Sequence, residues 1–157
     1  AVEYSWHNYQ NFFLWWVKQK NRADPTFALD KDLKVISSNL YGEDTCSLIP
    51  VKINNLFTGK STKKVHKYPT GVRPRDDGSF ICEYCNGSGR QIVERGFSTV
   101  EEASLAYLRH KKDYCKELAE DEYSRGNICS LVYKNLMNEG TLMFLLEFRN
   151  EGGVYDH

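Results

Sequence analysis

A run of basic residues is the first candidate for chemistry in this sequence. Between Thr58 and Arg75 there are basic side chains and no acidic one: Lys60, Lys63, Lys64, Lys67, Arg73 and Arg75. Lysine and arginine attract phosphate groups, and arginine can also bind a phosphate or a guanine edge through two parallel hydrogen bonds. The run is therefore either a contact for nucleic-acid phosphates or a solvated polar loop.

Two cysteines have the spacing of half a zinc site. Residues 82–89 read Cys-Glu-Tyr-Cys-Asn-Gly-Ser-Gly, and tetrahedral zinc usually takes two such pairs. The other cysteines stand alone in the sequence, and Cys82 and Cys85 would point to opposite faces of a strand. The pattern favours ordinary strand and turn cysteines over zinc ligands.

The elements that position these residues are predicted in residues 71–123. Asp77-Gly78 predicts a tight turn, because glycine adopts positive φ without steric cost. Residues 86–89, Asn-Gly-Ser-Gly, predict a second turn, and the alternation from Phe80 to Tyr84 predicts a strand. We expect two or three short strands with polar tips.

One amphipathic helix is predicted after these strands. Ser98 and Thr99, each followed three residues later by a glutamate, form a capping box. An apolar stripe at helical spacing is expected to pack against the back of the sheet: Ala103, Tyr107, His110, Tyr114 and Leu118. On this stripe His110 is expected to be a core histidine rather than a ligand.

This stretch resembles the DNA-binding domain of the APETALA/ethylene-response-factor family, which also occurs in phage endonucleases. The matching residues are Gly71-Val72-Arg73-x-Arg75, Gly78-x-Phe80, Gly96-x-x-Thr99-x-Glu101-Glu102-Ala103 and Ala106-Tyr107. The resemblance implies a three-stranded sheet that lies in the major groove of double-stranded DNA.

The same resemblance implies a set of DNA-binding residues. Arg73 and Arg75 match the opening arginines of the family, and Glu83 matches a strand acid. The next strand arginine of the family is replaced here by Cys85, which weakens the expected reading of bases. Arg90 and Arg95 are the candidates to substitute for it, and the basic run adds Lys63, Lys64 and Lys67.

An aromatic-rich helix is predicted from about Ser5 to Lys20, with Ser5 as its N-cap. Its apolar stripe is expected to pack on a core: Tyr9, Phe12, Phe13, Trp16 and Val17. Trp6 and Trp15 fall off this stripe, so we expect the helix to make a contact on a second side as well.

A strand, a loop, a second strand and a short helix are predicted next. The first strand is expected in residues 28–35 and the second in residues 45–50, and Pro50 is a residue favoured in the first turn of a helix. This segment resembles the diagnostic part of a phage family of HNH homing-endonuclease-like proteins. The matching residues are Leu29-Asp30-Lys31-Asp32, Tyr41-x-x-x-Thr45-Cys46, Ile49-Pro50 and Ile53-Asn54-Asn55-Leu56. In that family an aromatic-rich helix precedes the segment and an APETALA-type domain follows it.

The HNH resemblance implies a divalent metal, Mg²⁺, on the scissile phosphate. Asp30 matches the metal-ligand position, and Asn54 or Asn55 matches the distal one. Lys31 stands at the position of the family's histidine base, where a charged lysine cannot accept a proton at neutral pH. Lys31 therefore suits charge stabilisation, and Asp32 suits a second metal ligand or a group that orients water. The same residues also fit a solvated strand end in a module without catalysis.

Composition bounds these interpretations. The chain has 157 residues, enough for one ordinary domain or two very small ones, and its 41% apolar content is enough to form a buried core. Its positive and negative side chains balance, so no bulk charge indicates nucleic acid. The odd number of cysteines and the lack of an apolar run that could span a bilayer predict a reduced, intracellular protein without a membrane partner. The phage resemblance implies the cytoplasm of an infected bacterial cell.

The sequence thus predicts an α+β protein in four parts. These are an N-terminal helix with an HNH-like ββα module (residues 1–58), a basic linker (59–70), a three-stranded antiparallel sheet packed on one long helix (71–123), and a C-terminal helix and tail (124–157). In the last part residues 128–136 predict a helix, and periodicity does not assign residues 141–148.

Three functions remain open at this stage. The first is a metal-dependent endonuclease that cleaves or nicks double-stranded DNA. The second is an inactive relative that binds DNA or a host protein to modulate a host process during infection. The third is a protein-interaction module without a role on nucleic acid.

Overall fold

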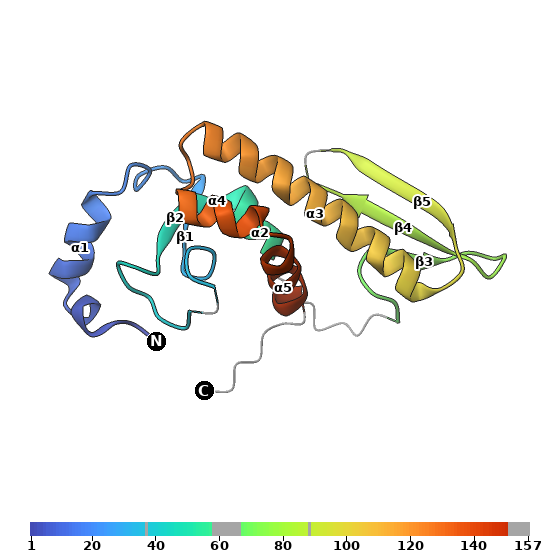
Figure 1. Cartoon of the computed structure of the whole chain (residues 1–157), viewed down its shortest axis with the longest axis horizontal. Coiled ribbons are helices and arrows are strands. Elements are labelled where there is room, and N and C mark those ends of the chain that lie inside the picture. Colours follow the sequence, from blue (N-terminus) through green and yellow to red (C-terminus); the bar gives the residue numbers. More distant parts are fainter. Residues whose placement is uncertain (37, 58–66, 88, 151–157) are drawn as a thin grey trace. The chain divides into compact units, whose positions relative to one another are not determined.

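The computed structural model describes residues 1–36, 38–57, 67–87 and 89–150, and its mixed α+β class is the predicted one (Figure 1). The chain divides into two compact units. The helical unit comprises Ala1–Gly59 and Lys116–His157, and the sheet unit comprises Lys60–Cys115. Helix α3 (Val100–Ser124) contributes to both units. The predicted linker and the predicted frayed tail lie mostly outside the described residues.

The sheet unit contains the predicted three-stranded antiparallel sheet. Its strands follow one another in space as in sequence: β3 (Val72–Pro74), β4 (Phe80–Cys85) and β5 (Gln91–Phe97). The turn between β3 and β4 is confirmed, since Gly78 has a φ of 83° and the Asp77 carboxylate accepts a hydrogen bond from the Ser79 amide at 2.9 Å. Only glycine adopts such a φ without strain.

The predicted capping box begins α3. The Glu102 amide donates to Thr99 Oγ1 at 3.2 Å, and the Thr99 amide donates to the Glu102 carboxylate at 3.4 Å. Two of the amides that a helix start leaves without intrahelical partners are thereby satisfied. Along α3 the predicted stripe is buried or half-buried throughout, from Ala103 to Leu118.

The helical unit begins differently from the prediction. A 3₁₀ turn (Tyr4–His7) comes first, and α1 (Tyr9–Val17) follows it. The N-cap is Asn8 rather than Ser5, because Asn8 takes an extended backbone and its side chain accepts a hydrogen bond from the Gln10 amide at 2.9 Å. An asparagine that bonds its own downstream amide favours a cap over a helix interior.

The predicted apolar stripe of α1 is also wrong in part. Trp6 and Trp15, which fall off that stripe, are buried together with Cys46, and Phe12, Trp16 and Leu29 pack against them. The break at Asn8 allows the turn to place the Trp6 ring 4.9 Å from the Trp15 ring, centroid to centroid. Three members of the predicted stripe, Tyr9, Phe13 and Val17, are exposed instead.

The strand–strand–helix order predicted next is present. Strands β1 (Phe27–Asp30) and β2 (Ser47–Pro50) pair antiparallel, and α2 (Val51–Phe57) follows directly and packs against both. The first strand ends at Asp30 rather than continuing to Val35, because the Asp30 carboxylate binds the two amides that would extend it. The order of elements is thus confirmed, whereas the HNH identity of the segment stays a prediction.

Two further helices complete the helical unit. The predicted helix near residues 128–136 is α4 (Ser130–Met137), and the unassigned stretch after it is helix α5 (Glu139–Asn150). The Asn138 side chain accepts a hydrogen bond from the Thr141 amide at 3.0 Å and so caps α5. Helix α5 packs against α2 and α4, and the buried side chains of these elements form the core of the unit: Ile53, Phe57, Val132, Leu136, Leu142 and Leu146.

Candidate nucleic-acid interface

Strand alternation gives the sheet of the sheet unit two different faces. Val72, Cys82 and Tyr84 are buried, and the Tyr84 ring lies 5.5 Å from the Tyr107 ring of α3, centroid to centroid. Their strand neighbours point to the opposite face, where Arg73 pairs with Ile81 in register and Glu83 pairs with Val93. The face turned away from α3 therefore carries the residues that the sequence predicted for DNA.

Arg73 and Glu83 form an ion pair on this outer face. The Arg73 guanidinium lies 2.9 Å from a Glu83 carboxylate oxygen, and 68% of the Arg73 side chain is exposed. An ion pair with so much access to water contributes little to stability. The guanidinium can therefore exchange Glu83 for a ligand at small cost, with its orientation already set by the sheet.

The other predicted arginines are exposed around the same sheet. Arg75 follows β3 and its amide donates to the Ser79 carbonyl at 2.8 Å, which fixes the backbone of the turn. Arg90 precedes β5 after the second turn, where its carbonyl accepts from the Asn86 amide at 3.2 Å. Arg95 lies on β5, next to the register shift opposite Phe80 and Cys82. Arginines are thus carried by both outer strands of the sheet and by its turns.

The predicted lysines are only partly described. Lys67 is exposed and its ammonium lies 5.5 Å from the centroid of the Tyr68 ring. Lys63 and Lys64 lie outside the described residues. The basic run can therefore be placed only from Lys67 onward.

The face toward α3 has a structural role. Glu94 binds Arg109 at 2.8 Å, and His110 Nε2 lies 3.3 Å from the same carboxylate but without hydrogen-bond geometry. The His110 ring is stacked 6.3 Å from that of Tyr84, so it belongs to the layer between sheet and helix, as predicted. Burial, and to a lesser degree Tyr107, raises the pKa of the Tyr84 phenol, whose oxygen has no hydrogen-bond partner among the described residues.

The two cysteines of the zinc-like pattern are separated as strand alternation predicts. Cys82 is fully buried, and burial raises the pKa of its thiol, whereas Cys85 is exposed. Within the described parts of the chain, His, Cys, Asp and Glu side chains do not gather in threes that could hold a metal. Cys82 and Cys85 therefore lie on opposite faces of β4.

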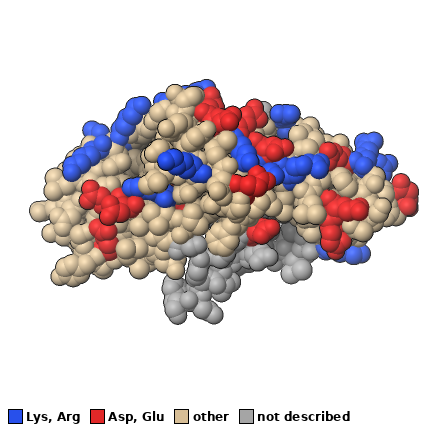
Figure 2. Space-filling model, in the orientation of Figure 1, with Lys and Arg blue, Asp and Glu red and all other residues tan. Residues whose placement is uncertain are grey.

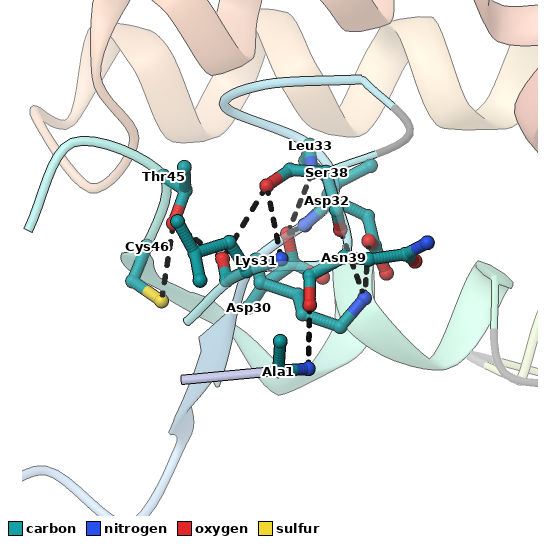
Figure 3. Close-up of polar contacts among 10 residues, drawn as sticks. Ala1, Asp30, Lys31, Asp32, Leu33, Ser38, Asn39, Thr45 and Cys46 are labelled. Carbon is teal, nitrogen blue, oxygen red and sulfur yellow. Dashed lines mark hydrogen bonds and ion pairs between the residues drawn. The ribbon is translucent and has the colours of Figure 1, made fainter. Parts of the chain in front are cut away.

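Asp30, the predicted metal ligand, organises a loop (Figure 3). Its side chain is 4% exposed, and its Oδ2 accepts hydrogen bonds from the Asp32 amide at 2.9 Å and the Leu33 amide at 2.7 Å. A carboxylate that accepts two amides after a strand ends that strand and turns the chain. The first role that the geometry gives Asp30 is therefore structural.

Lys31 and Asp32, the predicted catalytic pair, bind each other. The Lys31 ammonium lies 2.7 Å from Asp32 Oδ1 and donates to the Ser38 carbonyl at 3.1 Å (Figure 3). It also lies 5.7 Å from the centroid of the Tyr41 ring. Because an ammonium already occupies the carboxylate, a divalent cation bound there would meet like charge. Asn54, the predicted distal ligand, lies half-buried on α2. This arrangement does not fit a Mg²⁺ site, and we derive no catalytic step through one.

Sequence reasoning missed the polar contacts that hold the helical unit. Glu122 is almost fully buried and binds the Lys52 ammonium at 2.5 Å and the Asn127 side chain at 2.7 Å. Asn135 donates to the carbonyls of Leu33 and Lys34, at 2.9 and 3.2 Å. The partners are up to about a hundred residues apart, so residue spacing in the sequence does not predict these contacts. The one available clue was that Glu122 is an acidic residue at a helix position that faces the core.

The surface charge is mixed. Figure 2 shows Lys and Arg side chains interspersed with Asp and Glu side chains over the face in view, which agrees with the zero net charge of the sequence. None of the described helices has both the length and the apolar composition needed to cross a membrane. No family model, curated protein or solved structure matches this chain.

Proposed function

We propose that the sheet unit binds double-stranded DNA through the face of the sheet turned away from α3. The observation that carries the proposal is the exposed Arg73 on that face, which is ion-paired with Glu83 of the neighbouring strand, with further exposed arginines around the sheet: Arg75, Arg90 and Arg95. The major groove of B-DNA is about 12 Å wide and admits two β-strands, and in this sheet the neighbouring strands β3 and β4 carry the Arg73–Glu83 pair. The opposite face packs on α3, where the Tyr84 and Tyr107 rings meet.

The chemistry of this face suits bases as well as phosphates. A guanidinium can bind the O6 and N7 atoms of guanine, and a carboxylate can accept from the amino group of cytosine. Arg73 and Glu83 offer both groups side by side. The arginines in the turns and at the strand ends are placed for phosphates, which position a protein on the duplex without reading sequence.

The test removes two arginines together. We expect Arg73→Ala with Arg75→Ala to weaken binding to duplex DNA and to flatten its salt dependence, because each lost phosphate contact reduces the slope of log K against log salt by about 0.9. Fluorescence anisotropy over a salt series measures both quantities.

The matched control is Arg22→Ala with Arg125→Ala, which removes the same charge from exposed positions of the helical unit. Equal affinity and equal salt slope in the two double variants would contradict the proposal. If the unmodified protein does not bind duplex DNA, the result would favour the alternative in which the partner is a host protein.

Metal-dependent cleavage is the second candidate. The strand–strand–helix order of β1, β2 and α2 supports it, and the Lys31–Asp32 ion pair weighs against it. An active nuclease would nick supercoiled plasmid with Mg²⁺ or Mn²⁺ and lose nicking with Asp30→Ala. Since we propose binding as the function, we expect the plasmid to remain supercoiled on an agarose gel, even at protein concentrations that saturate the DNA. Nicking by the unmodified protein that depends on Mg²⁺ or Mn²⁺ would make cleavage the function instead.

A further inference from the structure

Helix α1 has two apolar sides, and among the described residues only one of them is buried. Trp6, Trp15 and Cys46 are buried on one side. On the other side large apolar side chains are exposed, at 71% for Tyr9, 47% for Phe13, 57% for Leu14 and 36% for Val17. We call these four residues the α1 patch. Among the described residues no other helix exposes such a group of large apolar side chains within nine residues.

The patch is a regular helical surface rather than scattered side chains. Tyr9, Phe13 and Val17 recur at intervals of four residues, so they lie in one row along α1. The rings of Tyr9 and Phe13 are stacked, with centroids 6.1 Å apart and planes inclined by 27°. An ordered apolar row on a water-facing helix marks a contact surface.

Charge narrows the choice of partner. From Tyr4 to Val17 the sequence contains no Asp, Glu, Lys or Arg, and the whole chain has a formal net charge of zero. A helix surface without charged side chains packs best against another surface without charge. A chain with zero net charge also lacks the electrostatic repulsion that keeps copies of a highly charged protein apart. An identical α1 patch meets both conditions.

We propose that the α1 patch pairs with the α1 patch of a second copy of this chain, with the two helices antiparallel. Lys18 and Lys20 follow the patch at one end only. Parallel pairing would place these charges beside each other, whereas an antiparallel two-fold separates them to opposite ends. Phe13 is the middle of the row, so the two-fold axis passes there and Phe13 faces its own copy. Each Tyr9 then faces a Val17, a large side chain against a small one.

The size of the patch predicts a weak dimer. A helix of nine residues is about 14 Å long, so one pair of such helices buries less than the roughly 800 Å² per partner of a standard interface. We therefore expect a concentration-dependent equilibrium between monomer and dimer. Sedimentation of the full chain over a wide concentration series measures it.

The first test compares two double variants. Phe13→Ser with Leu14→Ser should raise the dissociation constant of the dimer by at least about tenfold. Leu105→Ser with Leu131→Ser removes two exposed leucines of α3 and α4 and should leave it unchanged. Unchanged tryptophan fluorescence would show that the cluster around Trp6 and Trp15 remains folded. A chain that stays monomeric at every concentration, or that loses its dimer in both variants, overturns the proposal and leaves the patch to a different protein or to a lipid surface.

The second test reads the register. In a chain with the exposed thiols removed by Cys85→Ser and Cys129→Ser, Phe13→Cys should form a disulfide between two copies under oxidation. Helix axes about 8–10 Å apart bring facing Cα atoms within disulfide reach. Tyr9→Cys alone should not cross-link, because two such positions lie about 12 Å apart along the axis. A mixture of Tyr9→Cys and Val17→Cys should cross-link between the two variants. Cross-linking of Tyr9→Cys with itself but not with Val17→Cys would overturn the antiparallel arrangement.

Discussion

At the scale of single residues, the structure separates side chains that are available from side chains that are occupied. Arg73 is ion-paired yet mostly exposed, so its guanidinium can exchange partners. Asp30 and Lys31 are held by amides, a carbonyl and a carboxylate within their own loop. From the sequence, all three residues were equally good candidates for a functional site. Their contacts in the structure show which side chains can bind a ligand and which are already bound within the chain. This is why we place the function on the sheet rather than on the loop.

Tyr84 gives a prediction at this scale. Its phenol is buried between sheet and helix and has no hydrogen-bond partner in the part of the chain that the structure describes, and leaving a buried polar group unsatisfied costs roughly 1–3 kcal/mol. Tyr84→Phe removes that group and keeps the ring, so we expect equal stability or a gain of about 1 kcal/mol at neutral pH. Urea denaturation measures the free energy of unfolding. A loss of stability would show that the hydroxyl has a partner.

The same variant tests the pH dependence at alkaline pH. Burial raises the pKa of the Tyr84 phenol above its ordinary value of 10.0, so the folded protein keeps a proton that the unfolded chain loses. The unfolded state then binds fewer protons, and the free energy of unfolding decreases as pH rises above 10.0. Tyr107, whose pKa is raised in the same direction, contributes to this decrease. We expect the decrease to be smaller in Tyr84→Phe.

At the scale of elements, short polar motifs decide where helices and strands begin and end. Asn8 divides the predicted N-terminal helix, Asp30 ends β1, the Thr99–Glu102 box starts α3, and Asn138 caps α5. In each case a side-chain oxygen accepts a hydrogen bond from a backbone amide that has no carbonyl partner within the helix or strand. The capping box was readable from sequence because both partners lie within four residues in a familiar pattern. Asn8 was hidden because Ser5, three residues earlier, is an equally favoured N-cap residue.

Asp30 gives the prediction at the element scale. Asp30→Ala removes the acceptor of two amides, one of them on the buried Leu33, and we expect a loss of about 1–3 kcal/mol in the free energy of unfolding. Asp30→Asn keeps an acceptor oxygen and should lose less. Asp44→Ala, at an exposed position of the same unit, is the control. Denaturation with urea compares the four proteins, and an Asp30→Ala variant as stable as the control would contradict the structural role.

At the scale of the whole molecule, zero net charge and mixed surface signs direct attention to local surfaces. A protein without a bulk positive field relies on a few well-placed arginines for nucleic acid, which agrees with the proposed outer face of the sheet. The same neutrality permits two copies to approach through the α1 patch. We propose DNA binding for the sheet unit and self-association for the helical unit, so we expect substitutions to abolish each one and leave the other intact.

The sequence by itself determined the turns of the sheet unit, the strand around Phe80–Tyr84 and the start of α3. Its turns, strands and capping box depend on neighbours within a few residues, and alternation along β4 already assigned Cys82 and Cys85 to opposite faces. It also determined the α+β class and the order of β1, β2 and α2. These features are local, and local patterns are what periodicity and turn chemistry report.

Only the tertiary structure decided which side of α1 is buried and which polar residues are occupied. An amphipathic helix with two apolar sides can pack on either, and the choice here depended on Trp6, which the break at Asn8 placed against Trp15. The contacts of Glu122 with Lys52, and of Asn135 with the loop after Asp30, join residues about 70 and 100 positions apart. Such pairings depend on how the whole chain folds, because a buried carboxylate or amide takes whichever partner the packing brings within reach.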